Sequence, residues 1–196
     1  MIETHRSQFV LGTDIRKGPL EKAEEQIDIA ELTYKRNLVL RRGNAFSPIY
    51  PKDRINTIVI SGIGGELMSK ILGKFPYFLL RSLLILEANN EVPLVRKKLQ
   101  SLNFQIQSEQ IIEEKKHFYE ILTAKYINKP ISLTDEQIYF GPLLLKKKSS
   151  IFLKKWKKEF LYKKKILNIL KKNNLKKSKR FFRLSKENYM INNIIE

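Results

Sequence analysis

The chain has 196 residues, a formal net charge of +18 and no cysteine, and 42% of its residues are hydrophobic. This length suits one α/β domain with an appendage, and the lack of cysteine excludes disulfides and thiolate zinc sites. The first residues lack the apolar core of a signal peptide. The most apolar stretch, 75–86, contains Arg81 and is too short to cross a bilayer. We therefore expect a soluble, cytoplasmic protein with no membrane partner.

The first elements form an α/β pattern. Residues 9–14 predict a short buried strand that ends in the acidic residue Asp14, and residues 37–41 predict a second strand. Between them Pro19 suits the first turn of a helix. The apolar stripe of this helix consists of Leu20, Ala23, Ile27 and Ala30.

The most informative stretch is 57–68. Apolar residues suited to a buried strand run into Gly62, Gly64 and Gly65, and a helical pattern follows. A strand, a glycine turn and a helix build the ligand crevice of an open α/β sheet. The spacing is not that of the dinucleotide-binding motif, so a ligand loop and a plain tight turn both remain open at this point.

The remaining strands complete a sheet. Residues 83–87 predict a fourth strand, and the helix after it carries Pro93 and Leu99. Residues 104–112 and 117–124 form the two arms of an antiparallel hairpin. Strands that alternate with helices indicate an α/β fold, with a parallel sheet covered by helices on both faces.

A helical appendage follows Pro130, so we divide the chain into domains 1–128 and 129–196. Phe152, Trp156 and Phe160 repeat every four residues, which predicts an amphipathic helix, and a second helix is expected after Asn174. Because the spacing of the aromatic residues is helical, packing explains them better than base stacking.

The positive charge is concentrated in this appendage. Residues 141–196 hold 18 Lys and Arg against three acids, whereas residues 1–140 hold 20 against 17. Such an asymmetry favours a nucleic-acid partner. The alternatives are a solvated basic tail and a lysine excess caused by codon bias, although bias does not explain why the acids are lost from one end.

Several segments in this order resemble the bacterial tRNA (adenine(22)-N1)-methyltransferases, which use S-adenosylmethionine. They are the acidic turn with Gly-Pro at 12–20, the glycine motif at 60–65, the hairpin at 104–122 with its Tyr-Glu pair, and the segments 140–144 and 152–156. The resemblance covers nearly the whole chain. It implies a class I methyltransferase-like (Rossmann-like) sheet with a C-terminal basic helical domain that binds tRNA.

The chain also departs from the family pattern. Members begin with a strand and an Asp-Ile-Gly-type loop around the cofactor, for which we find no counterpart. Residues 43–45 and 86–89 also differ from the usual Gly-Asp-Gly and Gln-Pro-Asn runs. Because that first strand lies centrally, we expect an incomplete sheet in which strands 9–13 and 38–41 lose their link to strands 57–61 and 83–87. An upstream segment or a partner chain would supply it.

The resemblance implies a set of site residues. Cofactor contacts are expected at Asp14, Ile15, Asn44, Ala45, Gly62, Ile63 and Gly64. The Asp14 carboxylate would accept the ribose hydroxyls, or else it is simply an acid favoured at a helix start. Asn44 would accept from the adenine amino group, or it is a turn residue. Asn89 would contact the target base, or cap a loop.

For RNA, we predict that residues 146–186 supply most of the affinity. The expected phosphate contacts are Lys154, Lys155, Lys157, Lys158, Lys163 and Lys164. Six such contacts would give a slope of about −4 to −5 for log K against log salt. A slope nearer −3 would not be surprising, because the lysines lie on several faces.

The chemistry asks little of the side chains. Adenine N1 has a free lone pair, so methyl transfer depends on positioning, and the catalytic residue stays unnamed. His5 and His117 have no metal-like spacing. We expect a tRNA adenine-N1 methyltransferase that on its own binds S-adenosylmethionine weakly or not at all. The alternative is a non-enzymatic, RNA-binding relic of one. A nicotinamide-dependent oxidoreductase is disfavoured by the glycine spacing.

Overall fold

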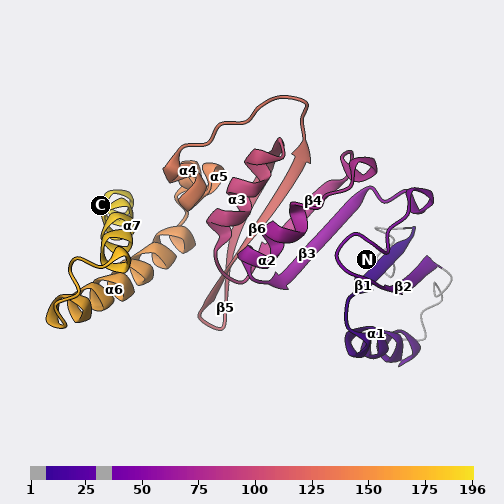
Figure 1. Cartoon of the computed structure of the whole chain (residues 1–196), viewed down its shortest axis with the longest axis horizontal. Coiled ribbons are helices and arrows are strands. Elements are labelled where there is room, and N and C mark those ends of the chain that lie inside the picture. Colours follow the sequence, from indigo (N-terminus) through magenta and orange to yellow (C-terminus); the bar gives the residue numbers. More distant parts are fainter. Residues whose placement is uncertain (1–7, 30–36) are drawn as a thin grey trace. The chain divides into compact units, whose positions relative to one another are not determined.

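The computed structural model describes residues 8–29 and 37–196 (Figure 1). Ala30, which we predicted on the helix stripe, and His5 lie outside this part. Contacts divide the chain into two compact units. The first lies within Met1–Asn56 and Ile71–Arg81, and the second comprises Thr57–Lys70 and Ser82–Glu196. The boundary between these units differs from the domain boundary that we predicted after residue 128, and that domain division stays a prediction.

The first unit contains β1 (Val10–Asp14), α1 (Lys17–Ile29) and β2 (Leu38–Arg42). The two strands are parallel, with Val10 opposite Leu38 and Asp14 opposite Arg42. The predicted stripe of α1 is half-buried at Leu20, Ala23 and Ile27, while most other described positions of the helix are exposed. Two short 3-10 turns, η2 (Pro51–Asp53) and η3 (Tyr77–Leu79), also belong to this unit.

The second unit contains a four-stranded sheet. Its elements are β3 (Thr57–Ile63), α2 (Gly65–Leu72), whose last residues belong to the first unit, β4 (Leu83–Ala88), α3 (Val92–Ser101), β5 (Phe104–Glu114) and β6 (His117–Tyr126). The strand order is β3-β4-β6-β5. Strand β3 is parallel to β4, and β6 is antiparallel to both β4 and β5. This confirms the predicted hairpin. Its turn is formed by Lys115 and Lys116, both with positive φ, as type I′ hairpin turns require.

The strands form two sheets, which agrees with the expected loss of the link between the first two strands and the next two. Along its length β1 pairs with β2, and β3 pairs with β4. Within the described part of the chain, β1 and β3 each lie at the edge of their own sheet. An edge strand presents backbone groups that can pair with another strand.

The C-terminal helices of the second unit are α4 (Asp135–Phe140), α5 (Pro142–Lys147), α6 (Ser150–Lys172) and α7 (Lys179–Ile195). Figure 1 shows the long helices α6 and α7 side by side. Their starts are capped by Ser149 and Ser178, whose hydroxyls accept backbone N–H bonds.

A hydrophobic core joins these helices to the sheet. It contains Phe140, Phe152, Trp156 and Ile191, together with Ile111 of β5. Phe152 is fully buried and Trp156 is 5% exposed. The aromatic stripe of α6 therefore packs in this core, as its helical spacing predicts. No helix among the described residues is long and apolar enough to cross a membrane.

Candidate functional site

The glycine run at the carboxyl end of β3 contains glycines with different roles. Gly62 has a φ of +74°, which favours glycine, and nothing lies within 4 Å of the place where a side chain would begin. Its N–H donates to Oε2 of Glu87 at 3.0 Å. Gly62 thus leaves open space at the edge where α/β folds bind ligands.

Gly65, in contrast, is required for packing. A Cβ there would lie 2.3 Å from the backbone oxygen of Glu91, and the Gly65 N–H donates to the Asn90 carbonyl at 3.1 Å. At Gly64 a Cβ would lie 3.0 Å from Oδ1 of Asn90. Gly64 and Gly65 therefore form a tight turn against the loop after β4, whereas Gly62 leaves open space for a ligand.

The loop after β4 lies beside the glycine run. The Asn89 N–H donates to the Ile63 carbonyl at 3.0 Å, so these two predicted site residues are neighbours. Sequence reasoning missed Glu87, although the departure from the family pattern at 86–89 was a signal. Its Oε1 atom is buried and has no hydrogen-bond partner within the described part of the chain.

The other predicted cofactor residues lie at the carboxyl end of β1 and β2. Oδ1 of Asp14 accepts from the Arg16 N–H at 2.7 Å, and the Asp14 side chain is 32% exposed. The side chain of Ile15 is exposed. This contact places the carboxylate just before α1, as the helix-start interpretation expects, and leaves Asp14 accessible to a ligand.

The altered family motif forms a turn after β2. The Asn44 N–H donates to Oγ of Ser47, and the Ser47 N–H donates to the Asn44 carbonyl, both at 3.0 Å. Ala45 has a φ of +52°, in the left-handed region where glycine is favoured. A glycine would suit this position, and Ala45 adopts the left-handed conformation at some cost.

The predicted cofactor residues are therefore divided between the two units. Asp14, Ile15, Asn44 and Ala45 belong to the first, and Gly62, Ile63 and Gly64 belong to the second. Each set lies at the carboxyl end of a parallel strand pair. Among the described residues there is no group of three or more side chains that could hold a metal ion.

A buried ion network, which the sequence did not reveal, lies beneath the C-terminal helices. The guanidinium of Arg96 is fully buried and pairs with Glu109 at 2.8 Å and with Glu120, which also pairs with Lys155. Burial alone would lower the pKa of Arg96, but the charges of Glu120 and Glu109 raise it. Burial alone would raise the pKa of Glu120, but Arg96 and Lys155 hold it below its usual value.

This network fixes the start of the helical region to the sheet. Oε2 of Glu109 accepts the Leu143 N–H at 2.8 Å, and the Arg96 guanidinium donates to the Tyr139 carbonyl at 3.3 Å. A Cβ at Gly141 would lie 2.6 Å from the guanidinium. The Tyr-Glu pair of the hairpin and the segment 140–144, both part of the family resemblance, therefore meet in one cluster.

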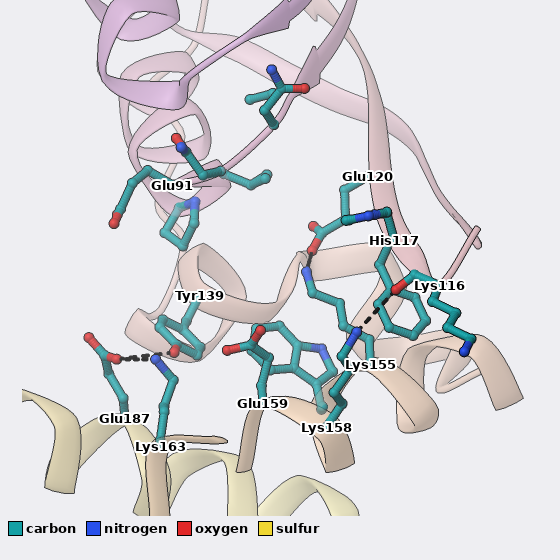
Figure 2. Close-up of a pocket in the computed structure, with 17 residues that line it drawn as sticks. Glu91, Lys116, His117, Glu120, Tyr139, Lys155, Lys158, Glu159, Lys163 and Glu187 are labelled. Carbon is teal, nitrogen blue, oxygen red and sulfur yellow. Dashed lines mark hydrogen bonds and ion pairs between the residues drawn. The ribbon is translucent and has the colours of Figure 1, made fainter. Parts of the chain in front are cut away.

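Several of the lysines predicted to meet phosphates are engaged within the protein. Lys154 pairs with Glu113 and Lys163 pairs with Glu187, both at 2.7 Å, and Lys155 pairs with Glu120. Figure 2 shows the last two pairs. A carboxylate partner neutralises much of the charge that a phosphate would otherwise meet.

The other three predicted lysines have no carboxylate partner within the described residues. Lys158 donates to the backbone carbonyl of Lys116 at 3.0 Å. Lys164 lies over the Phe160 ring, 5.8 Å from its centroid. Lys157 is exposed. No carboxylate among the described residues therefore offsets the charge of these three lysines.

The far end of the helical pair carries cations that the sequence reasoning did not single out. We define the helical tip as residues 171–180, where α6 ends and α7 begins. Its cations are all exposed and make no ion pair with any described residue: Lys171, Lys172, Lys176, Lys177, Lys179 and Arg180. The signal was the lack of acids between Glu159 and Glu187.

Taken together, two parallel strand pairs with ligand-accessible carboxyl ends, followed by basic helices, define a Rossmann-type α/β protein of the methyltransferase class. The crystal structure of a Streptococcus agalactiae protein in the NADB-Rossmann superfamily superposes with a TM-score of 0.90 at 28% identity, covering 100% of this chain and 83% of that one. The sequence model of the tRNA (adenine(22)-N(1))-methyltransferases matches residues 1–189. The chain belongs to this family.

Two further relatives agree. The tRNA (adenine(22)-N(1))-methyltransferase of Bacillus subtilis is 30% identical over 161 residues, which cover 79% of this chain and 66% of that protein. A Streptococcus pneumoniae protein, described as a candidate tRNA (m1A22) methyltransferase, was crystallised with S-adenosyl-L-methionine. It has a TM-score of 0.86 at 26% identity, covering 100% of this chain and 85% of that one. The chain thus spans about two thirds of the curated relative it matches.

Proposed function

We propose that this chain transfers a methyl group from S-adenosylmethionine to N1 of adenine 22 in tRNA, in the cytoplasm. The observation that carries this proposal is the family match over residues 1–189, which includes both strand pairs and the basic helices. The bound S-adenosylmethionine in the Streptococcus pneumoniae relative supports the choice of methyl donor.

In this proposal the cofactor is held at the carboxyl ends of the strands. The accessible carboxylate of Asp14 accepts the ribose hydroxyls, and Asn44 lies on the adenine side. Gly62 gives the cofactor open space, beside Ile63 and Gly64. Asn89, which is bonded to the Ile63 backbone, is placed to contact the target base. Because adenine N1 has a free lone pair, these residues contribute positioning rather than proton transfer.

A further strand completes the site. Strands β1 and β3 each lie at the edge of their sheet, and both carry predicted cofactor residues at their carboxyl ends. An upstream segment or a partner chain that adds a strand there would satisfy backbone groups. Without it, we expect this chain to bind S-adenosylmethionine weakly.

The tRNA phosphates are met by the helices. We assign the strongest contacts to the helical tip, whose cations lack carboxylate partners, and further contacts to Lys157, Lys158 and Lys164 of α6. Lys154, Lys155 and Lys163 already pair with carboxylates, so they contribute less to the affinity for tRNA.

The test is calorimetric titration of the purified chain with S-adenosylmethionine, followed by the same titration with a version extended by the upstream coding sequence. We expect weak or absent binding first and restored binding second. The extended version should then methylate adenine 22 of a tRNA transcript. Low-micromolar binding by the chain alone would contradict the need for a further strand.

Asp14→Ala in the extended version tests the ribose contact. Losing a charge-assisted hydrogen bond should weaken cofactor binding by about 1.5–3 kcal/mol. Glu21→Ala, on the exposed face of α1, is the matched control. An unchanged dissociation constant for Asp14→Ala would remove Asp14 from the site. An extended version that binds tRNA without methylating it would favour the RNA-binding relic.

A further inference from the structure

The second unit contains a pocket of about 390 Å³ between the loop after β4 and helix α6. Figure 2 shows Glu91 on one side of it, Lys116 and His117 of the β5–β6 hairpin on another, and Tyr139, Glu159 and Glu187 from the helices. Its volume lies within the range of about 300–1,000 Å³ that small-ligand sites occupy.

The walls combine aromatic and polar groups. Phe118, Tyr139 and Trp156 line the pocket, together with Asn89 and Asn90 at the carboxyl end of β4. Burial and the nearby carboxylate of Glu187 raise the pKa of Tyr139, so its hydroxyl stays protonated. The rings of Phe118 and Tyr139 are half-buried, and such rings beside amide groups suit a flat heterocycle with hydrogen-bonding edges. The ammonium groups of Lys155 and Lys158 lie over the rings of Trp156 and Phe118, 4.7 and 5.5 Å from their centroids.

One buried group in the wall lacks a partner. Trp156 is 5% exposed, and its Nε1 atom has no hydrogen-bond partner within the described part of the chain. A buried indole N–H usually finds an acceptor. An acceptor supplied by a bound molecule would satisfy it.

The cations of the pocket are not all free. Lys155 and Lys163 pair with Glu120 and Glu187. Lys158 donates to a backbone carbonyl and lies over the Phe118 ring, 5.5 Å from its centroid, and it has no carboxylate partner among the described residues. The side chain of Lys116 makes no ion pair with any described residue. An anionic group would therefore be favoured at the hairpin side, and repelled near Glu91 and Glu159.

We propose that this pocket binds one unpaired nucleotide of the RNA substrate. The base lies against the aromatic wall and accepts from Trp156 Nε1, and the phosphate lies at the hairpin side near Lys116 and Lys158. Glu91 and Glu159 can accept from exocyclic amino groups, which favours adenine, cytosine or guanine over uracil. This inference rests on the proposed function, because the nucleotide is part of the tRNA that the enzyme methylates.

Trp156 is the only tryptophan in the chain, so its emission reports on this pocket. The experiment titrates the full chain with a labelled oligo-adenylate of five residues. It follows both the anisotropy of the label and the emission of Trp156. We expect saturable quenching of Trp156 with the same midpoint as the anisotropy change. A chain of ribose phosphates without bases should bind and leave the emission unchanged.

Variants locate the bound nucleotide. Lys116→Ala and Lys158→Ala should each remove about 0.7 from the slope of log K against log salt. Lys171→Ala, at the helical tip, should leave the amplitude of quenching unchanged. Anisotropy without any change in Trp156 emission, or no binding of the oligonucleotide, would overturn the proposal. The titration contains no S-adenosylmethionine, so it tests the pocket independently of methyl transfer. If the chain methylates tRNA but fails this test, only the pocket assignment is refuted.

Discussion

The two ends of helix α6 are both rich in lysine, but their surroundings differ. Near its start, Lys154, Lys155 and Lys163 face carboxylates from β5, β6 and α7. At the helical tip the cations are exposed and have no partner in the described chain. Lysine thus anchors the helix at one end and offers unneutralised charge at the other.

Packing explains this difference. The start of α6 lies on a core shared with the sheet, including Ile111 of β5, so acids of the hairpin come within reach. The far part packs against α7 through the small cluster of Leu167, Leu170 and Leu184. The following variants test whether the two ends differ in this way, from the largest expected effect to the smallest.

Arg96→Ala should have the largest effect. It leaves Glu109 and Glu120 buried without their main partner, and breaking a buried ion pair costs about 3–5 kcal/mol. Urea unfolding measures the loss. Arg96→Lys keeps a positive charge but loses the forked geometry of the guanidinium. Its free energy of unfolding should therefore lie between those of the parent chain and Arg96→Ala. A loss below about 1 kcal/mol for Arg96→Ala would mean that the network does not anchor the helices.

Low pH should weaken the ion network that anchors the start of α6 to the sheet. The folded-state pKa of Glu120 lies below its ordinary value of 4.5. Its contribution to stability is therefore complete above that value and lost as the pH falls through the lower, folded-state pKa. Glu120→Gln should be less stable than the parent chain by about 2–3 kcal/mol at neutral pH. Urea unfolding over a pH series should show this gap narrowing below the ordinary pKa. A gap that does not depend on pH would contradict the ion pairing.

Lys155→Ala should cost about 1.5 kcal/mol, because Glu120 loses a charged hydrogen-bond donor but keeps Arg96. The matched control is Lys157→Ala, two positions along the same helix, which is exposed and has no carboxylate partner. It should change the free energy of unfolding by less than about 0.5 kcal/mol. Equal losses in the two variants would show that side-chain length, and not the ion pair, stabilises this region.

The smallest stability effect is expected at the helical tip. Replacing Lys176 or Lys177 by Gln breaks no ion pair with a described residue and relieves repulsion among neighbouring cations. The free energy of unfolding should stay within about 0.5 kcal/mol of the parent value. Differential scanning calorimetry of both variants measures this. A marked loss would reveal a structural role for these lysines.

The sequence predicts the elements well, because their apolar spacing is local. The strands, the hairpin and the packing of Phe152 and Trp156 are all confirmed, as is the split between β1–β2 and β3–β4. The ion network was not predictable in this way. Arg96 meets Glu120, which is 24 residues away, only once the sheet has formed.

Side-chain partners also limited the prediction of the RNA contacts. All six predicted lysines have similar local sequences, yet three of them face acids that only the fold brings near. The positive φ of Ala45 and the crowding at Gly65 likewise depend on the backbone path. Such features need coordinates, because they depend on residues that are distant in the sequence.

The central claim is that the lysines of the helical tip contact tRNA phosphates, whereas the lysines that pair with carboxylates do not. It is tested most directly by measuring tRNA binding across a salt series for two matched variants. One replaces Lys171 and Lys172 of the tip by Gln. The other replaces Lys154 and Lys186, which are equally exposed but pair with Glu113 and Asp135. The tip variant should make the slope of log K against log salt less negative by about 1.4–1.8. The other variant should leave the slope nearly unchanged. Equal changes in slope would contradict the account.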